Sequence, residues 1–359
     1  MPLQYITVAN VRNIHEARLT FHPHLNIITG PNASGKTSLL EAIHLLGTAR
    51  SFRATRIRQV IQHSVDRLRV TGAVEDGGHT KQMGLERSTQ TTQVHIDGQA
   101  RRSATDLARH LPLLVIDPDS HSLLVSGPKL RRHFLDWGVF HVKHDFLSLW
   151  RRYGRALKQR NAALRQNQPD AAVCAWDDEL AQTARQIHSM RIAYLDDLRP
   201  LAEDYVGRMF VEETPLETRY VAGWDPEIPL ERQLGSALTR DRSLGHTSVG
   251  PHLADIHFAT AGTAVRHHIS RGQQKLLASA LRLAQAAQLA HLTGKHSHLL
   301  VDDLPSELDV AHRERFIQAL IGLDSQLFIT ATDARLLPLP KTTGAKVFHV
   351  ERGIITDVV

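Results

Sequence analysis

The stretch that decides the fold is Gly30-Pro31-Asn32-Ala33-Ser34-Gly35-Lys36-Thr37, which matches the pattern G-x-x-x-x-G-K-[ST]. It follows the apolar run Leu25–Thr29, which is predicted to be a strand, and opens a run with helical periodicity. Glycines let the backbone wrap closely around a phosphate group, and the successive N–H groups from about Asn32 to Thr37 are expected to point toward it. The pattern in this context predicts a nucleotide-binding P-loop.

The residues of this loop have separate expected roles. Those whose backbone is expected to surround the phosphates are Gly30, Pro31, Asn32, Ala33, Ser34 and Gly35. Lys36 is expected to reach the β- and γ-phosphates, and Thr37 is expected to ligate Mg²⁺. The loop therefore predicts ATP and Mg²⁺ as cofactors.

A pair of acids near the other end of the chain complements the loop. Asp302 and Asp303 directly follow the apolar run His298–Val301, which is predicted to be a strand. A carboxylate in this place can hold the hydration shell of Mg²⁺, and we assign this role to Asp302. Asp303 occupies the position where many such ATPases place a glutamate that polarises the attacking water. Its shorter side chain predicts slow hydrolysis, and Glu307 is a second candidate for the base.

A short motif, Ser270-Arg271-Gly272-Gln273, stands before the helical run that leads to Asp302. Ser270 is placed to cap this helix, and the free N–H groups of the first turn would bind an anion. Taken alone, S-x-G-Q is more often an ordinary cap. The order of P-loop, insertion, S-x-G-Q, acidic strand and the S-x-L-D motif at 306–309 is that of ABC-type heads. In that class Ser270, Gly272 and Gln273 would contact the γ-phosphate bound to an opposing copy.

The long separation between Lys36 and Asp302 demands a large insertion within the nucleotide fold. Strand signals vanish from about residue 128 to 210, where two long helical stretches, 129–166 and 171–210, are separated by a turn at 167–170. We therefore predict an α/β fold, an ABC-type P-loop ATPase head, formed by residues 1–117 and 245–359. A mainly helical lobe, residues 118–244, is expected to be inserted between them.

The chain resembles the RecF family, bacterial recombination-mediator ATPases related to the heads of Rad50 and SMC proteins. The resemblance covers the whole chain. It rests on these segments: NVRN at 10–13, GPNASGKTSLLEAIHLLG at 30–47, RSFR at 50–53, GPKLRRHFLDW at 127–137, LKQRN at 157–161, GPHLAD at 250–255 and SRGQ at 270–273. The P-loop is generic, whereas the segments at 127–137 and 158–161 are specific to this family.

The resemblance implies a weak, DNA-linked ATPase that acts as a switch in recombinational repair. An ATP-dependent homodimer would clamp duplex DNA near single-strand gaps and work with RecR and RecO to promote loading of RecA. Two departures from the wider ABC class limit this reading. Asp117 stands where a glutamine is expected after the strand 113–116, and Thr330 or Thr332 stands where a switch histidine often lies.

Basic residues offer candidate contacts to DNA phosphates, which cations can bind without reading sequence. The candidates are Arg53, Arg151, Arg152, Arg155, Lys158 and Arg160. A solvated helix face is the alternative for the cluster at 151–160. Aromatic residues make up only 5% of the chain and do not interleave with the basic runs, which favours duplex backbone over base stacking. The formal net charge of +6 agrees with a polyanionic partner without establishing one.

Two further function classes stay open at this point. A nucleotide-binding subunit of an ABC-type transporter shares the head motifs, but it is disfavoured by the family-specific segments and by Asp117. A scaffold that binds ATP and barely hydrolyses it is the other. The chain has a single cysteine, Cys174, and its apolar runs are shorter than the roughly twenty residues of a membrane helix. We therefore expect a cytoplasmic protein.

Overall fold

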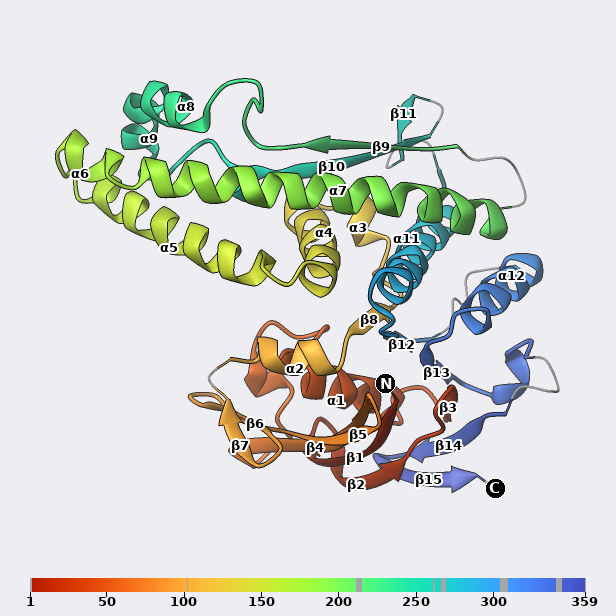
Figure 1. The fold of residues 1–359 in the computed structure, drawn as a ribbon. Helices are drawn as coiled ribbons and strands as arrows, with labels where there is room; N and C mark the ends of the chain where they lie inside the picture. The colour runs from red at the N-terminus through yellow and green to blue at the C-terminus, as the bar shows by residue number, and fades with distance from the viewer. Residues whose placement is uncertain are drawn as a thin grey trace. The chain divides into compact units, whose positions relative to one another are not determined.

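The computed structural model describes residues 2–101, 103–210, 215–260, 262–265, 269–303, 309–339 and 344–358 (Figure 1). Contacts along the chain divide it into two units. The first comprises Met1–Ser120, Arg208–Val211 and Lys275–Val359, and the second comprises His121–Gly207 and Glu212–Gln274. Among the helices in these ranges, none has the length and apolar character needed to cross a bilayer.

The first unit contains a six-stranded, mostly parallel sheet of order β15-β14-β3-β13-β12-β8. Its strands are β3 (Leu25–Thr29), β8 (Leu113–Ile116), β12 (His298–Val301), β13 (Gln326–Ala331), β14 (Lys346–Glu351) and β15 (Ile354–Val358). Every residue of β3, β12 and β13 is buried, as expected for parallel strands covered on both faces. The β14–β15 pair is antiparallel. Strands from the two ends of the chain therefore lie side by side in one sheet.

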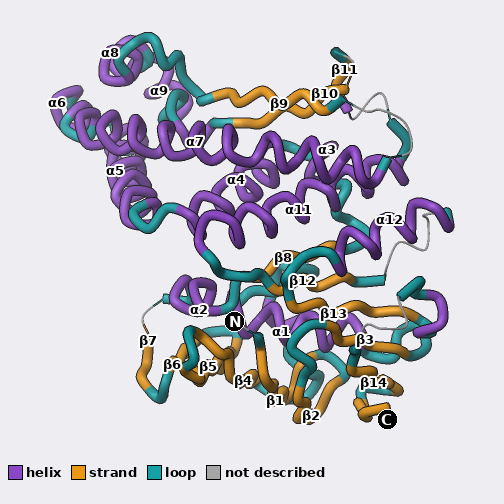
Figure 2. The backbone as a smooth tube through the Cα atoms, turned by 45° about the vertical axis from the view of Figure 1, so that its right-hand side comes forward, coloured by secondary structure: helices purple, strands orange, loops and turns teal. Residues whose placement is uncertain are grey.

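A second sheet of the same unit is antiparallel, with order β2-β1-β4-β5-β6-β7. Its strands are β1 (Leu3–Val11), β2 (Ile14–Thr20), β4 (Arg67–Asp76), β5 (His79–Ser88), β6 (Thr92–Ile96) and β7 (Gln99–Arg101). Helix α1 (Lys36–Thr48) lies between the two sheets (Figure 2). Its residues Leu39, Leu40 and Ile43 are fully buried in a core to which both sheets contribute. The apolar periodicity after the P-loop therefore predicted the buried face of α1 correctly.

Gly47 lies one residue before the end of α1. The helix continues through Thr48, and Ala49 adopts the left-handed conformation that ends it, with φ 53°. Gly47 is buried, and a Cβ atom at this position would collide with the side chain of Leu113. The glycine therefore permits close packing between α1 and β8, and it does not serve as a stop signal.

Three further helices belong wholly or partly to the first unit. Two of them are shorter than α1, and the third begins in the second unit. They are α2 (Thr105–His110), α11 (Arg271–Thr293) and α12 (Val310–Ile321), with single 3-10 turns at Ile57–Gln59 and Ala334–Leu336. The division between the two units falls within the first turn of α11.

The second unit consists of helices with one small sheet. The helices are α3 (Ser122–Val125), α4 (Pro128–Val142), α5 (Phe146–Arg165), α6 (Asp170–Cys174), α7 (Asp177–Met209), α8 (Leu230–Ser236) and α9 (Leu238–Leu244), with a 3-10 turn at Pro251–Leu253. The sheet, of order β11-β10-β9, contains β9 (Leu216–Val221), β10 (Asp255–Thr260) and β11 (Thr263–Ala264). The predicted turn near 167–170 separates α5 from α6, whereas the first predicted helical stretch is two helices, α4 and α5.

The division into units differs from the boundaries expected from the sequence. The first segment of the first unit ends at Ser120 where residue 117 was expected, and residues 245–274 join the inserted lobe although they were expected in the head. Strand pairing explains the second difference. Strand β9 lies within the insertion and pairs with β10 in antiparallel register, so β10 belongs to the same small sheet.

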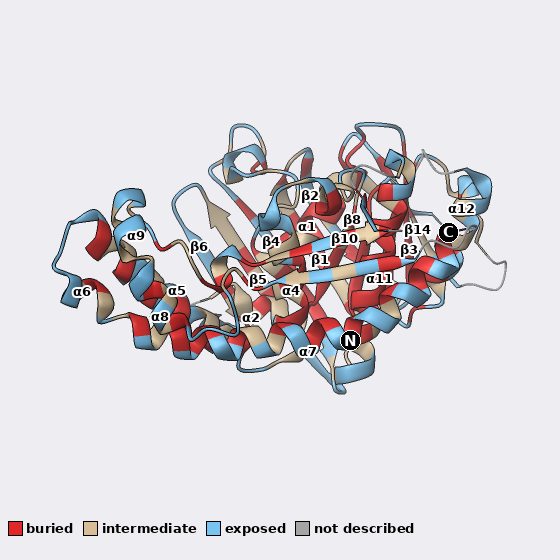
Figure 3. Cartoon of the chain, turned by 90° about the horizontal axis from the view of Figure 1, so that it is seen from above, coloured by how far each residue is buried: buried red, intermediate tan, exposed pale blue. Residues whose placement is uncertain are grey.

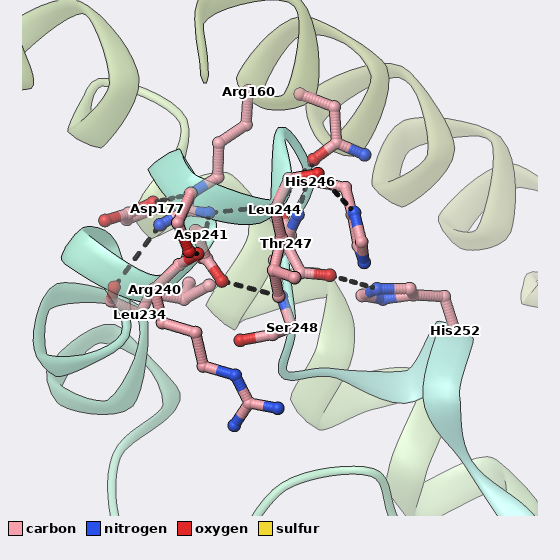
Figure 4. A network of polar contacts seen from close by, with 12 residues as sticks. Arg160, Asp177, Leu234, Arg240, Asp241, Leu244, His246, Thr247, Ser248 and His252 are labelled. Carbon is pink, nitrogen blue, oxygen red and sulfur yellow. Dashed lines mark hydrogen bonds and ion pairs between the residues drawn. The ribbon is translucent and has the colours of Figure 1, made fainter. Parts of the chain in front are cut away.

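A buried guanidinium joins three helices of the second unit (Figure 4). Arg160 of α5 is completely buried. Its Nε donates to Asp177 Oδ1 at 2.8 Å, and its Nη1 donates to Asp241 Oδ2 at 2.6 Å and to Thr247 Oγ1 at 2.9 Å. Asp241 in turn accepts from the backbone N–H of Ser248. The network ties α5 to the start of α7, to α9 and to the segment after α9.

This environment corrects the expectation that Arg160 contacts DNA. A guanidinium with no exposed surface and with two carboxylate partners is not available to a phosphate. The neighbouring Asn161 takes part in the same arrangement, because its Oδ1 accepts from both the N–H and the hydroxyl of Thr247. Residues 160 and 161 of the family-specific KQRN segment are therefore structural.

Replacing Asp241 by Ala should lower the free energy of unfolding of the protein by about 3–5 kcal/mol, because it leaves part of a buried positive charge without its partner. Arg152→Ala on the same helix as Arg160 is the matched control. Its ion pair with Glu179 is partly exposed, with side-chain exposures of 41% and 35%, and its loss should cost far less than the loss of Asp241. Urea unfolding of the two variants measures the difference. Equal losses would contradict the assignment of a structural role to the Arg160 network.

Candidate nucleotide-binding site

The P-loop connects β3 to α1 through backbone conformations that require glycine at two positions. Gly30 has φ 148° and Gly35 has φ 121°, values that side chains other than hydrogen rarely permit. Space is also restricted: a Cβ on Gly30 would collide with the carbonyl oxygen of Val350, and one on Gly35 would lie 2.9 Å from Asn13 Nδ2. The two glycines of the sequence motif are therefore needed both for conformation and for packing.

Lys36 turns its side chain back over the loop. Its Nζ donates to the carbonyl oxygens of Gly30 at 2.8 Å and of Pro31 at 2.9 Å. The residue is only 8% exposed, and burial lowers the pKa of the ammonium group, an effect that the nearby carboxylates of Asp303 and Asp302 oppose. The ammonium is therefore held by two neutral carbonyl groups, which an anionic phosphate oxygen can replace.

The hydroxyl of Ser34 is a second polar group held in the loop. Its Oγ atom is buried, and among the described residues it has no hydrogen-bond partner. A buried hydroxyl without a partner costs free energy, on the order of 1–3 kcal/mol. An anionic ligand in the loop would remove that cost.

The acidic residue at the end of β12 meets the loop, as the sequence predicted. Thr37 Oγ1 donates to Asp302 Oδ1 at 2.8 Å, and Thr330 Oγ1 donates to the same oxygen at 3.0 Å. Burial raises the pKa of the Asp302 carboxyl, while the hydrogen bonds from Thr37 and Thr330 and the charge of Arg53 act in the opposite direction. The structure thus brings together residues from β12, β13 and the P-loop around one carboxylate.

The role of Thr330 was missed by sequence reasoning, which noted only that it or Thr332 stands where a switch histidine often lies. Thr330 is fully buried at the end of β13, and its Oγ1 also accepts from the backbone N–H of Asp303 at 2.6 Å. Its hydroxyl is thus committed to holding the two aspartates, while Thr332 is exposed. The available signal was a polar residue at the carboxyl end of the strand next to β12.

Of the two candidate bases, only Asp303 lies among the described residues. Asp303 lies beside the loop in the left-handed conformation, with φ 48°, and its carboxylate acts on the pKa of Lys36. Glu307 lies outside the described residues, as do Ser306 and Leu308 of the S-x-L-D motif. Asp309, the last residue of that motif, caps α12 by accepting from the N–H of His312 at 2.9 Å.

A cavity of about 980 Å³ opens beside the loop. Its lining residues are Arg12, Asn13, Ala33, Ser34, Gly35, Lys36, Thr37, Ser38, Arg53, Arg58, Gln59, Ile61 and His63. Four of these are cationic, and they come from the P-loop, the turn after β1 and the segment after α1. Arg12 is oriented by Glu41, a fully buried carboxylate to which it donates two hydrogen bonds, at 2.7 and 3.0 Å. Sequence reasoning assigned Arg12 no part in this site.

The S-x-G-Q motif forms a helix cap in the second unit, as predicted. The N–H of Ser270 donates to Gln273 Oε1 at 2.9 Å, and the N–H of Gln273 donates to Ser270 Oγ at 3.3 Å. This reciprocal pair is a capping box at the start of α11. Ser270 and Gln273 are not buried, and the space next to Gly272 is open.

The expected DNA-contacting residues fall into different environments. Arg151, Arg155 and Lys158 lie on α5, whose surface alternates between buried and exposed bands (Figure 3). Arg152 pairs with Glu179, with hydrogen bonds of 2.9 and 3.0 Å, and Arg160 is buried. Arg53 is exposed and lines the nucleotide-sized cavity. Three of the six residues therefore form a basic surface on one helix.

Comparison with known proteins agrees with this geometry. The family described as "RecF/RecN/SMC N terminal domain" matches residues 2–356. The chain is 45% identical to "DNA replication and repair protein RecF" of Pseudomonas fluorescens and 46% identical to that of Pseudomonas syringae pv. tomato. Each alignment covers 99% of this chain and 98% of the relative.

Solved structures give the same result. The structure of "the recombination mediator protein RecF-ATP in RecFOR pathway" superimposes with a TM-score of 0.88 at 27% identity, covering 100% of this chain and 98% of that chain. The Smc head bound to a domain of ScpA has a TM-score of 0.60 at 12% identity, covering 100% and 98%, which shows the fold alone. The predicted α/β, SMC-like ATPase head is confirmed. The chain belongs to the RecF family of DNA replication and repair proteins, within the RecF/RecN/SMC group.

Proposed function

We propose that the protein is an ATP-dependent DNA-binding switch of recombinational repair. ATP joins two copies head to head, the dimer clamps duplex DNA near a single-strand gap, and slow hydrolysis releases it. The observation that carries the proposal is the meeting of Thr37 and Asp302 at 2.8 Å beside a loop built for phosphates. Family membership leaves the alternative of a transporter subunit without support.

The fit of the loop to ATP rests on two polar groups, the Ser34 hydroxyl and the Lys36 ammonium. The Ser34 hydroxyl is buried and unpaired among the described residues, and the Lys36 ammonium bonds to two loop carbonyls. Phosphate oxygens satisfy both groups. The cavity extends beyond the loop to Gln59, Ile61 and His63, which gives space for ribose and base. The solved RecF-ATP structure of a related protein supports the same ligand.

The oxygen atoms around Asp302 fit Mg²⁺, a hard cation that prefers carboxylate, hydroxyl and phosphate ligands. Thr37 and Asp302 would hold the ion, which would neutralise charge on the phosphates when bound. Thr330 orients the Asp302 carboxylate, and its bond to the Asp303 N–H fixes the start of the following segment. Asp303 is placed near Lys36 and is our candidate for orienting the attacking water. Its short side chain supports slow turnover.

The second copy would complete the site through the start of α11. Ser270 and Gln273 are not buried and Gly272 has open space beside it, so the first turn of the helix is accessible to a ligand. By analogy with ABC-type heads, Ser270, Gly272 and Gln273 bind the γ-phosphate carried by the partner copy. ATP would then hold the dimer together, and its hydrolysis would release the DNA.

DNA would contact the cations on the surface of α5, Arg151, Arg155 and Lys158, and Arg53 would serve the nucleotide cavity. These side chains suit the phosphate backbone, which they would bind without reading sequence. RecR and RecO are proposed as partners, and promotion of RecA loading as the outcome. The RecFOR pathway named for the related structures supports these partners.

The dimer is tested by binding to a gapped duplex with and without ATP, for wild type and for Ser270→Arg. ATP should tighten binding by wild type, and the variant should lose this gain while its own P-loop still binds ATP. The reason is that the long arginine side chain fills the space that the γ-phosphate carried by the partner copy would need. Equal DNA binding by both proteins in all conditions would sink the composite-site clamp and point to general adhesion of a basic surface.

The proposed metal site is tested with Thr330→Val, a nearly isosteric change that removes the hydroxyl. Loss of this buried hydrogen bond should raise the Mg²⁺ concentration needed for half-maximal ATP binding about fivefold, corresponding to about 1 kcal/mol. Thr332→Val is the matched control and should leave it unchanged, because Thr332 is exposed. An unchanged Mg²⁺ requirement in Thr330→Val would remove Thr330 from the site.

The DNA surface is tested by the salt dependence of binding. Replacing Arg155 and Lys158 together by Ala should reduce the slope of log K against log salt by about 0.9 for each phosphate that the variant no longer neutralises. Arg185→Ala is the control, because Arg185 on α7 pairs with Glu231 at 2.7 Å and should leave the slope unchanged. Identical slopes for all proteins would place the DNA-binding surface elsewhere.

A further inference from the structure

Two hairpin turns from opposite ends of the chain meet at the P-loop. The turn between β14 and β15 is formed by Arg352 and Gly353, and the backbone N–H of Gly353 donates to the carbonyl oxygen of Ser34 at 2.8 Å. The turn between β1 and β2 contains Asn13, whose Nδ2 donates to the same oxygen at 2.9 Å. One carbonyl oxygen of the P-loop therefore accepts two hydrogen bonds, which uses both of its lone pairs.

Fixing this oxygen also fixes a donor for the ligand. In a trans peptide the C=O and the following N–H point in opposite directions. Holding the Ser34 oxygen against the two turns therefore directs the Gly35 N–H away from that oxygen, and Gly35 is one of the residues that line the cavity. The donor is oriented before the ligand arrives, and a preorganised donor binds more tightly than one that must be ordered on binding.

The close fit of the C-terminal hairpin against the loop begins earlier along β14. This strand pairs in parallel with β3, with His349 opposite Thr29, and a Cβ on Gly30 would collide with the Val350 carbonyl. At the turn, a Cβ on Gly353 would collide with the backbone carbonyl of Asn13. Gly353 is not among the residues that line the cavity. Its effect on a nucleotide is therefore indirect, through the P-loop or through Asn13.

We propose that Asn13 and the Arg352–Gly353 turn are positioning elements of the P-loop, which hold the Ser34 carbonyl so that the Gly35 N–H faces the phosphates. The C-terminal hairpin is then part of the nucleotide-binding apparatus although it does not line the cavity. This inference rests on the proposed ATP site.

The experiment compares Gly353→Ala with Gly98→Ala in the full-length protein. Both glycines are second residues of tight hairpin turns with nearly equal backbone: Arg352 and Gly353 have φ 49° and 82°, and Asp97 and Gly98 have φ 51° and 74°. Alanine is strained equally at both. Only at Gly353 does the added Cβ meet other atoms, because nothing lies within 4 Å at Gly98.

The affinity for ATP and for ADP, with Mg²⁺ present, should fall about tenfold in Gly353→Ala, the scale of one lost hydrogen bond. Gly98→Ala should bind both nucleotides like wild type and should lower the melting temperature less than Gly353→Ala, because its Cβ meets no other atoms. If wild type binds ATP and the two alanine variants bind it equally well, the inference is overturned while the ATP site stands. A wild type that fails to bind ATP overturns both.

A double variant separates positioning from direct contact, because Asn13 itself lines the cavity. Asn13→Ala alone should weaken nucleotide binding. Because the Cβ of Gly353→Ala displaces Asn13, that substitution should already remove the Asn13 hydrogen bond. Adding Asn13→Ala to Gly353→Ala should then cause little further loss. If the two losses multiply, or if Asn13→Ala binds like wild type, the shared action on Ser34 is refuted, even where Gly353→Ala proves unstable.

Discussion

The arrangement of the head depends on one buried oxygen atom, Asp302 Oδ1, which accepts hydrogen bonds from Thr37 and Thr330. A carboxylate that is largely removed from water is tolerated only when its oxygens are satisfied, and these two hydroxyls supply that condition. Thr37 can reach the oxygen only if β3, β13 and β12 are neighbours in this order. The geometry of the site therefore depends directly on the order of the strands in the sheet.

The inserted lobe also contains buried charged groups that are satisfied by hydrogen bonds. Its longest helices are α5 and α7, and its interior contains buried guanidinium groups with carboxylate partners. Arg160 bonds Asp177 and Asp241, and Arg191, also fully buried, bonds Asp136 and the carbonyl oxygen of Pro251. Removing one member of such a buried ion pair is strongly destabilising, because the other charge is left without a partner. The pairs therefore make the helix arrangement specific even where their net contribution to stability is small. The lobe therefore holds its own shape through contacts among its own residues.

The short local motifs of the site could be predicted from the sequence, whereas the contacts between strands that are distant in the chain could not. The P-loop, the acid after β12 and the cap at Ser270 were predictable because each is a short pattern with its own chemistry. Thr330 and Gly353 were not, since their roles depend on which strands become neighbours. Arg160 was misjudged because it stands in a basic run. It follows Leu149, Tyr153 and Ala156 at helical spacing, and all three are buried, so the periodicity of α5 contained the correct answer.

The order in which the parts of the site occur in the chain has a consequence for synthesis. The P-loop leaves the ribosome early, whereas Asp302, Val350 and Gly353, which complete its surroundings, leave it among the later residues. Between them the ribosome makes the whole inserted lobe. A nascent chain therefore has no finished nucleotide site to occupy. Nucleotide binding then indicates that the chain has been synthesised through the β14–β15 hairpin.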